Sequence, residues 1–263
     1  MKRSTKRRLR QGGLYAVLAA VVIFLAASVD WDVVRANFWT PGLGGNWHDL
    51  ILTGAKNTII YTVIAFALGL ALALLLALMK LSDVVVYRWI ATCYIELFRG
   101  LPALITILFM AFAVPIAFQW TPPGGTAGAG VIGLVLVAGA YMAETLRAGL
   151  QAVPKGQAEA ARSLGMSPFG TMVHVVIPQA FRIIIPPLTN ELVLLIKDTS
   201  LLSIVGATVG SREHTTTARD FLSSGDTAGT GAALTQAALL YLIITLPLTR
   251  LVAWLEKRQQ RAR

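Results

Sequence analysis

The sequence predicts an all-α protein that crosses a membrane about six times. Hydrophobic residues make up 56% of the 263 residues and charged residues only 14%, against about 45–50% and about 25% in soluble domains. The apolar residues gather in runs long enough to cross a bilayer. Because a bilayer interior offers no water, these runs must satisfy their backbone polar groups as helices, and none alternates like a barrel strand.

Six apolar runs are long enough to count as candidate spans. The run at 57–79 contains no charged residue and is the clearest. The run at 101–120 is also uncharged but has Pro102 at its start and Pro115 within it, and the fifth run contains Pro186 and Pro187. We expect spanning helices at 14–29, 57–79, 101–120, 128–143, 180–196 and 232–255.

Basic residues are concentrated in four segments that six spans place on one side of the membrane. These are the N-terminal tail, the loop before the third span, the loop after the fourth span and the C-terminal end, and they hold most of the 23 Lys and Arg residues. The positive-inside rule makes this side cytoplasmic and puts both termini there. Topology therefore explains the net charge of +10, and nucleic acid is not an expected partner.

The domain organisation follows from the spans. Residues 1–29 are expected to form a basic cytoplasmic tail and the first span, 30–56 an external loop, and 57–256 a transmembrane domain with a cytoplasmic loop at 150–179; residues 257–263 form a second basic tail. The first segment also resembles a signal peptide, with small residues after its apolar run. We favour an uncleaved span, because the apolar run is long and the tail strongly basic.

The loops are too short to hold a soluble catalytic domain. The nearest match to a phosphate-binding loop, at Gly165, Gly170 and Thr171, lacks the lysine. The chain has one cysteine, Cys93, and three histidines far apart in sequence, so no metal site is expected. We expect no catalytic residues and no enzymatic activity in this chain, and the energy for any transport comes from a separate polypeptide or an ion gradient.

The cytoplasmic loop after the fourth span is predicted to contain a rigid corner. Residues 157–164 are rich in helix formers, and Gly165 can take the positive φ that ends such a helix. Ser167 followed by Pro168 is typical of a helix N-cap with proline in the first turn. We expect two short helices joined by a sharp turn at the membrane surface, an arrangement suited to transmitting force from a cytoplasmic partner.

This loop resembles the EAA loop of the permeases of ATP-binding-cassette (ABC) importers, whose pattern is E-A-A-x3-G-x9-I-x-L-P. The sequence matches this pattern at Glu159, Ala160, Ala161, Gly165 and Pro178. It departs from the pattern at Val175 and Ile177, which replace the isoleucine and the leucine. Further stretches are similar to the polar amino acid branch of that family, at 94–102, 140–147, 153–157, 177–180 and 197–201. The resemblance covers about residues 52–256.

The resemblance implies a type I ABC importer fold and the role of a permease in a bacterial cytoplasmic (inner) membrane, translocating a polar amino acid or a close analogue. It implies as partners a dimer of cytoplasmic ATP-binding subunits, a second permease that is identical or homologous, and an extracytoplasmic substrate-binding protein. ATP and magnesium would bind the ATPase partner, and this chain would hold no cofactor. The short helix would dock into the ATPase partner, with Glu159 and Arg162 forming polar pairings.

The fifth span carries polar residues that lipid cannot solvate. On a helical wheel Asn190, Glu191, Lys197 and Asp198 share an arc of roughly 120°, so this face must avoid lipid. One interpretation is a substrate path in which the carboxylates hold an α-ammonium group and Lys197 an α-carboxylate. The alternative is that Lys197 and Asp198 form an ion pair at the outer interface, with Glu191 tied to another helix.

Two further pairs of opposite charge have i, i+3 spacing. Glu144 and Arg147 lie near the inner end of the fourth span, and Glu96 and Arg99 precede the third. Neighbours at this spacing on a helix can form ion pairs. We interpret both as gate or helix-anchoring pairs.

Two other functions stay open from the residues alone. A gradient-driven amino acid carrier or channel subunit would normally show internal repeats and enough spans for a complete pathway, and no repeat is visible. A membrane scaffold would need neither Glu191 within a span nor the rigid corner. The permease of an ATP-driven importer accounts for both features.

Overall fold

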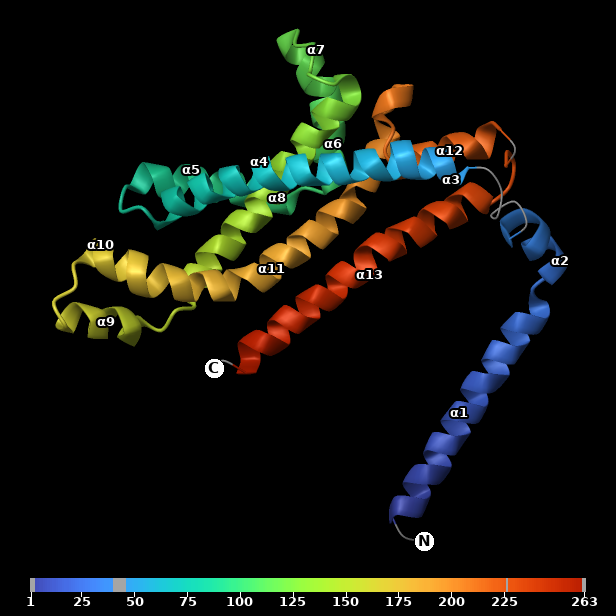
Figure 1. Cartoon of the computed structure of the whole chain (residues 1–263), viewed down its shortest axis with the longest axis horizontal. Helices are drawn as coiled ribbons and strands as arrows, with labels where there is room; N and C mark the ends of the chain where they lie inside the picture. The colour runs from blue at the N-terminus through green and yellow to red at the C-terminus, as the bar shows by residue number, and fades with distance from the viewer. Residues whose placement is uncertain (1–2, 40–45, 226, 262–263) are drawn as a thin grey trace.

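The computed structural model describes residues 3–39, 46–225 and 227–261, and within these ranges it is a bundle of helices with no strand (Figure 1). The ends of both predicted tails (1–2 and 262–263), part of the predicted external loop (40–45) and residue 226 lie outside the described residues. The longest helices are α1 (Arg3–Ser28), α4 (Lys56–Leu81), α5 (Val85–Gly100), α8 (Gly125–Gln151), α11 (Ile177–Asp198) and α13 (Ala232–Arg261). The shorter helices are α2 (Trp31–Val34), α3 (Trp47–Asp49), α6 (Ala103–Leu108), α7 (Val114–Phe118), α9 (Lys155–Ser163), α10 (Pro168–Thr171) and α12 (His214–Ser223). Between them lie π-helical turns at Arg35–Trp39, Leu50–Ala55, Phe109–Ala113 and Met172–Val176 and 3₁₀ turns at Thr199–Ile204 and Val209–Ser211.

Helical runs long and apolar enough to cross a membrane account for most of the described chain. Five single runs qualify, at Gln11–Ser28, Trp47–Leu81, Gly125–Gln151, Pro168–Ile204 and Ala232–Gln259. A sixth span results if the bent pair Val85–Gly100 and Ala103–Phe118 counts as one. The prediction of an all-α polytopic membrane protein with about six spans is confirmed.

The third predicted span, 101–120, corresponds to the helical segment Ala103–Phe118, but the segment before it differs from the prediction. The segment before it, expected as a loop, contains helix α5, and the chain bends by 105° between α5 and α6. Ala91 and Ile95 of α5 are buried in the bundle core, so one face of this helix packs against the bundle, and the other side exposes both polar and apolar residues. The bend occurs because Pro102 has no N–H to continue the helix and holds the preceding residue extended; Leu101 has φ −90° and ψ 142°.

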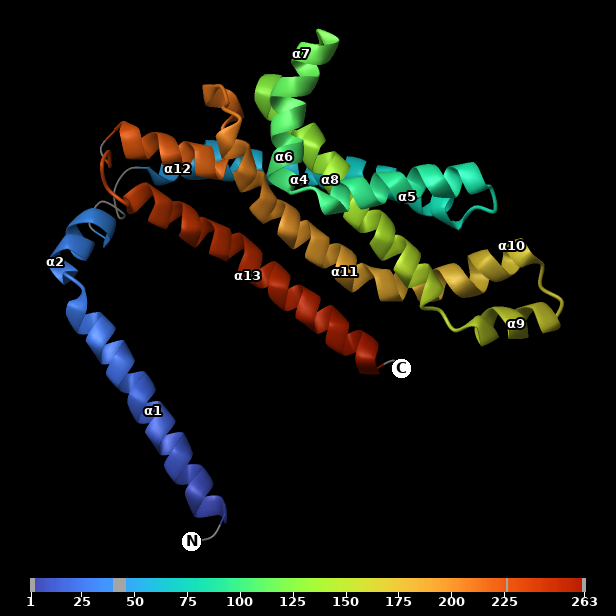
Figure 2. The ribbon, with the colours of Figure 1, turned by 180° about the vertical axis from the view of Figure 1, so that it is seen from behind.

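The two ends of the bundle differ. Figures 1 and 2 show α9 and α10 forming a tip at one end, with α12 at the other. Helix α1 diverges from the other spans, and its side chains from Gln11 onward are exposed. The first turns of α1 and the last turns of α13 both lie away from α12, which is the arrangement expected of two termini on one side of the membrane.

Small residues let the central spans approach closely. Helix α4 packs along α8, where Gly69 leaves room for Met142 and Gly139 leaves room for Leu72. An added Cβ at either glycine would come within 2.8 Å of a carbon of that neighbour. Since lipid tails are as apolar as the side chains, close packing rather than the hydrophobic effect holds such helices together.

The contact between α8 and α11 depends on Gly149, and Gly149→Ala is expected to weaken it. An added Cβ would overlap Cγ1 of Ile184, which is buried. We expect a loss of roughly 1–3 kcal/mol, the usual cost of overpacking, measured as a lower thermal unfolding midpoint in detergent. Gly12→Ala, in open space on α1, is the matched control and should keep the midpoint; an unchanged midpoint for Gly149→Ala would contradict this account.

A buried polar cluster at the α12 end ties the chain after α11 to α4. Asn57 of α4 donates a hydrogen bond to the backbone carbonyl of Arg212 at 2.9 Å. Thr58 accepts one from the backbone N–H of His214 at 3.1 Å. The carboxylate of Glu213 caps α12, with its oxygens 2.6 Å from backbone nitrogens of the first turn. These contacts fix α12 across the ends of the spans.

Acid should lower the stability of the α12 end of the bundle, because His214 is buried there. Its side chain is 1% exposed and its ring meets that of Tyr241 edge-on, with 5.0 Å between centroids. Burial lowers the pKa of His214 from 6.5 to about 4. The folded state therefore resists protonation of this ring, so its contribution to stability is complete above pH 6.5 and is lost as the pH falls toward 4. Burial raises the pKa of Glu213, which acts in the opposite sense.

The pH dependence of the thermal unfolding midpoint measures this effect. As the pH falls from about 7.5 to about 4.5, we expect His214 to lower the free energy of unfolding of the wild-type protein by about 2–3 kcal/mol. His214→Gln should flatten the decline, whereas His48→Gln, at a site with the side chain 76% exposed, should leave it unchanged. A decline that persists in full in His214→Gln would assign the acid sensitivity to other groups.

Candidate functional site

A cavity of about 240 Å³ lies between α8, α11 and the start of α6. Its wall is mostly apolar and includes Leu134, Val137 and Leu195. Two carboxylates, those of Glu191 and Asp198, also line it. A small apolar cavity with a few polar groups is the usual form of a ligand site.

The acidic side chains of this cavity lie near an arginine. Glu191 and Asp198 are seven residues apart on α11, about two helical turns, and both are half-buried. Arg99, at the end of α5, holds its guanidinium 5.5 Å from the ring centroid of Tyr141, which lines the cavity. The cavity therefore holds two acids, and the positive charge of Arg99 lies beside its wall at Tyr141. Charges in such apolar surroundings interact more strongly than in water.

The structure divides the four polar residues predicted on this helix. Glu191 and Asp198 line the cavity, whereas Asn190 and Lys197 are exposed on the surface of the single chain. The cavity therefore meets only the edge of the arc that carries the two acids. In the described part of the chain, no ion pair joins Lys197 to Asp198.

Glu144 of α8 is the centre of an ion-pair network near the α9 end. It pairs with Arg147 one turn along the same helix and with Lys80 of α4, whose Nζ lies 3.2 Å from a carboxylate oxygen. The i, i+3 spacing pointed to Arg147, whereas Lys80 is 64 residues away and reaches the network only because α4 packs on α8. The interpretation as a helix-anchoring or gate pair stays a prediction.

The interpretation of Glu96 and Arg99 as a pair needs correction. Both side chains are exposed on α5, and no ion pair joins them within the described ranges. Arg99 lies instead over the ring of Tyr141, because an aromatic face attracts a guanidinium. Arg99 therefore lies beside the cavity through its contact with Tyr141, whereas Glu96 does not line the cavity.

The predicted corner in the cytoplasmic loop is confirmed. Helix α9 ends just before Gly165, which takes φ +87°. The N–H of Gly165 bonds to the carbonyl of Arg162 at 3.0 Å, and that of Met166 to the carbonyl of Ala161 at 3.2 Å. This pair of bonds is the Schellman pattern that ends a helix at glycine. Ser167 then caps helix α10, and its Oγ accepts a hydrogen bond from the backbone N–H of Gly170 at 3.1 Å.

The tip formed by α9 and α10 presents both polar and apolar side chains to solvent. The exposed members of the predicted docking set are Glu159, Ala160, Arg162 and Gly165. Ala161 is buried and packs into the chain. Leu164 and Phe169, 87% and 78% exposed, flank the corner. Sequence reasoning missed these two; their signal is large apolar residues on both sides of a predicted turn. Exposed apolar side chains on a rigid turn indicate a surface for a protein partner.

Residues that could support metal or nucleophilic chemistry are dispersed. Within the described ranges, no three His, Cys, Asp or Glu side chains come together to hold a metal ion. His48 and His174 are exposed, and His214 is buried at the α12 end. Cys93 is exposed on α5.

Spans that enclose a charged cavity, joined by a rigid tip, define a subunit of a membrane transport system. Residues 69–261 match the family described as "Binding-protein-dependent transport system inner membrane component". The chain belongs to this family and is a membrane component of a binding-protein-dependent transport system.

Individual relatives agree with this family. The L-cystine transport system permease protein TcyB of Bacillus subtilis (strain 168) is 39% identical over 179 residues, which cover 68% of this chain and 71% of that protein. The probable glutamine ABC transporter permease protein GlnM of the same strain is 32% identical over 224 residues, which cover 81% of this chain and 94% of that protein. The glutamine transport system permease protein GlnP of Escherichia coli (strain K12) is 33% identical over 214 residues, which cover 80% of this chain and 93% of that protein.

A solved structure gives the same result. The crystal structure of an amino acid ABC transporter with histidines contains a chain that is 35% identical, with a TM-score of 0.71 over 80% of this chain and 94% of that chain. The predicted fold class, that of a type I ABC importer permease, and the predicted family are confirmed. The comparisons do not favour the alternative of a gradient-driven carrier or channel.

Proposed function

We propose that this chain is the permease subunit of an ABC importer that moves a polar amino acid or a close analogue into a bacterial cytoplasm, driven by ATP hydrolysis on a separate subunit. Relatives named for cystine and glutamine transport support this substrate class. The observation that carries the proposal is the cavity between α8 and α11, which two acids line and which has Arg99 beside its wall at Tyr141.

The charges around the cavity suit a zwitterion. A free amino acid carries an ammonium and a carboxylate group on the same carbon. Glu191 and Asp198 would hold the ammonium group, and the guanidinium of Arg99 would hold the carboxylate through two parallel hydrogen bonds. Asn190 and Lys197 are exposed in the single chain and would contact substrate only where a second permease faces α11.

The tip would dock on the ATP-binding subunit. Glu159 and Arg162 would supply the polar pairings, and Leu164 and Phe169 would supply apolar area to bury. The proposed assembly contains a dimer of these subunits, which bind ATP and magnesium, a second permease, identical or homologous, and an external substrate-binding protein. This chain would have no ATPase site of its own.

The proposed location is the bacterial inner membrane, with α9, α10 and both termini on the cytoplasmic side. The basic segments at that end support this orientation through the positive-inside rule. Helix α12 and its polar cluster would then lie on the side of the substrate-binding protein.

Reconstitution of the chain in proteoliposomes with its ATP-binding subunit and binding protein tests the proposed function. ATP supplied on the side of the tip should drive uptake of the amino acid that the binding protein binds, and a non-hydrolysable analogue should not. Uptake driven by an imposed ion gradient without ATP would establish a carrier instead. A binding protein specific for a ligand of another class would refute the amino acid assignment.

A further inference from the structure

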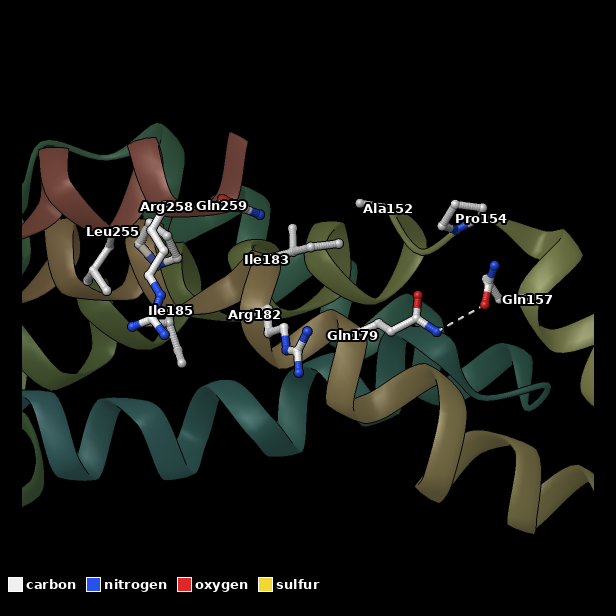
Figure 3. Close-up of a pocket in the computed structure, with 11 residues that line it drawn as sticks. Ala152, Pro154, Gln157, Gln179, Arg182, Ile183, Ile185, Leu255, Arg258 and Gln259 are labelled. Carbon is white, nitrogen blue, oxygen red and sulfur yellow. Dashed lines mark hydrogen bonds between the residues drawn. The ribbon is translucent and has the colours of Figure 1, made fainter. Parts of the chain in front are cut away.

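A second and larger hollow, of about 960 Å³, lies between the first half of α11, the end of α13 and the start of α9 (Figure 3). It shares no lining residue with the cavity that holds Glu191. The transport scheme proposed above assigns no role to it.

The charge around this hollow is basic only. Arg182 of α11 and Arg258 of α13 border it, and their side chains extend in the same direction in Figure 3. None of the residues that line it is acidic. Among the described residues, neither guanidinium has an ion-pair partner, although that of Arg258 lies 5.4 Å from the ring centroid of Trp254. Two arginines from neighbouring helices that share one hollow attract an anion.

The rest of the lining selects among anions. Ile183, Ile185 and Leu255 give the hollow an apolar wall. A small inorganic anion gains nothing from such a wall, because charged groups lose hydration beside apolar surface. An amphiphile with an anionic head and an acyl chain fits both the arginines and the wall.

The position of the hollow along the spans points to the same class of ligand. Arg182 lies in the second turn of α11 and Arg258 in the last turn of α13. Both helix ends belong to the α9 end of the bundle, which the proposed function places at the cytoplasmic surface. Anionic lipids of that leaflet bind basic pockets between spans through their headgroups.

We propose that this hollow binds an anionic phospholipid, with Arg182 and Arg258 on the phosphate and the isoleucine and leucine side chains against the start of an acyl chain. The proposal rests on the cytoplasmic orientation in the proposed function. Gln157 of α9 also borders the hollow, and its side chain accepts a hydrogen bond from Gln179 of α11 at 3.4 Å. A bound lipid would therefore brace the base of the docking tip against the spans.

Lipid retention by the full-length protein, purified with its partner subunits, tests the proposal. The protein is placed in nanodiscs with equal amounts of phosphatidylcholine and phosphatidylglycerol, re-extracted, and the retained lipids are identified by native mass spectrometry. Wild type should retain phosphatidylglycerol preferentially, and Arg182→Gln with Arg258→Gln should lower that preference roughly tenfold. The matched control, Arg250→Gln with Lys257→Gln, removes two exposed basic residues of α13 outside the lining and should keep the preference.

Four results would overturn the proposal. They are no preference in wild type, an undiminished preference in the arginine double variant, an equal loss in the control, and displacement of the lipid by equimolar inorganic phosphate. The test for a preference in wild type and the test with phosphate both use wild-type protein, so they stay decisive even if the arginine double variant fails to fold. Because retention does not require transport, retained phosphatidylglycerol together with failed ATP-driven uptake would contradict the proposed function and leave the lipid site standing.

Discussion

Replacing Glu159 by lysine, or Gly165 by aspartate, should abolish ATP-driven uptake while the protein still inserts and folds. Glu159 is exposed on the tip, and losing one partner of a charge pair in an interface costs about 2–5 kcal/mol, so the proposed docking should weaken at least roughly tenfold. Gly165 has no atom within 4 Å of an added Cβ, so its substitution causes no clash. Its φ of +87° instead makes a side chain cost roughly 1–2 kcal/mol of backbone strain, which the corner relieves by changing the angle between α9 and α10.

Matched variants separate docking from general damage. Glu256→Lys makes the same change of charge at an exposed position of α13 and should transport normally. Gly165→Asn should retain more activity than Gly165→Asp, because asparagine is the residue that most often takes the place of glycine at the left-handed end of a helix. The readouts are uptake and ATP hydrolysis stimulated by the binding protein, both in proteoliposomes. Normal stimulated hydrolysis in Glu159→Lys or Gly165→Asp would remove the tip from the ATPase interface.

The second large effect is expected at the cavity, where Glu191→Gln should lower uptake at limiting substrate roughly tenfold or more. A hydrogen bond to a charged group contributes about 1.5–3 kcal/mol, and each 1.4 kcal/mol is about a factor of ten. Asp198→Asn should act in the same direction, since Asp198 lines the same cavity. The loss should appear in transport kinetics while the unfolding midpoint and ATPase docking stay unchanged.

Glu96→Gln is the control for this prediction, because it neutralises an exposed carboxylate outside the cavity. It should transport at the wild-type rate. Unchanged half-saturation and maximal rate in Glu191→Gln would favour the alternative in which Glu191 only ties α11 to the bundle. A fall in the unfolding midpoint with unchanged transport would lead to the same conclusion.

Features that local rules govern were predictable from the sequence. The corner at Gly165 and the cap at Ser167 depend on residues a few positions apart, so the pattern of glycine, serine and proline was enough. The spans followed from apolar length, because the lipid and the interior of the bundle both favour apolar side chains and a backbone that bonds within the helix. Helix α5 was missed since it is amphipathic, and only its packing through Ala91 and Ile95 shows where it lies.

The sequence by itself determined the class of protein, the number of spans and the corner that would meet a cytoplasmic partner, since each depends on composition or on neighbours in the chain. Tertiary structure alone decided which charged groups meet. Glu191 and Asp198 line the cavity, whereas Asn190 and Lys197 are exposed. Arg99 contacts Tyr141 and not Glu96. Lys80 forms an ion pair with Glu144. The physical reason is that a helical wheel gives the direction of a side chain but not the neighbour on that side, and for charges in a membrane the neighbour determines whether the group binds substrate, anchors a helix or lies at the surface.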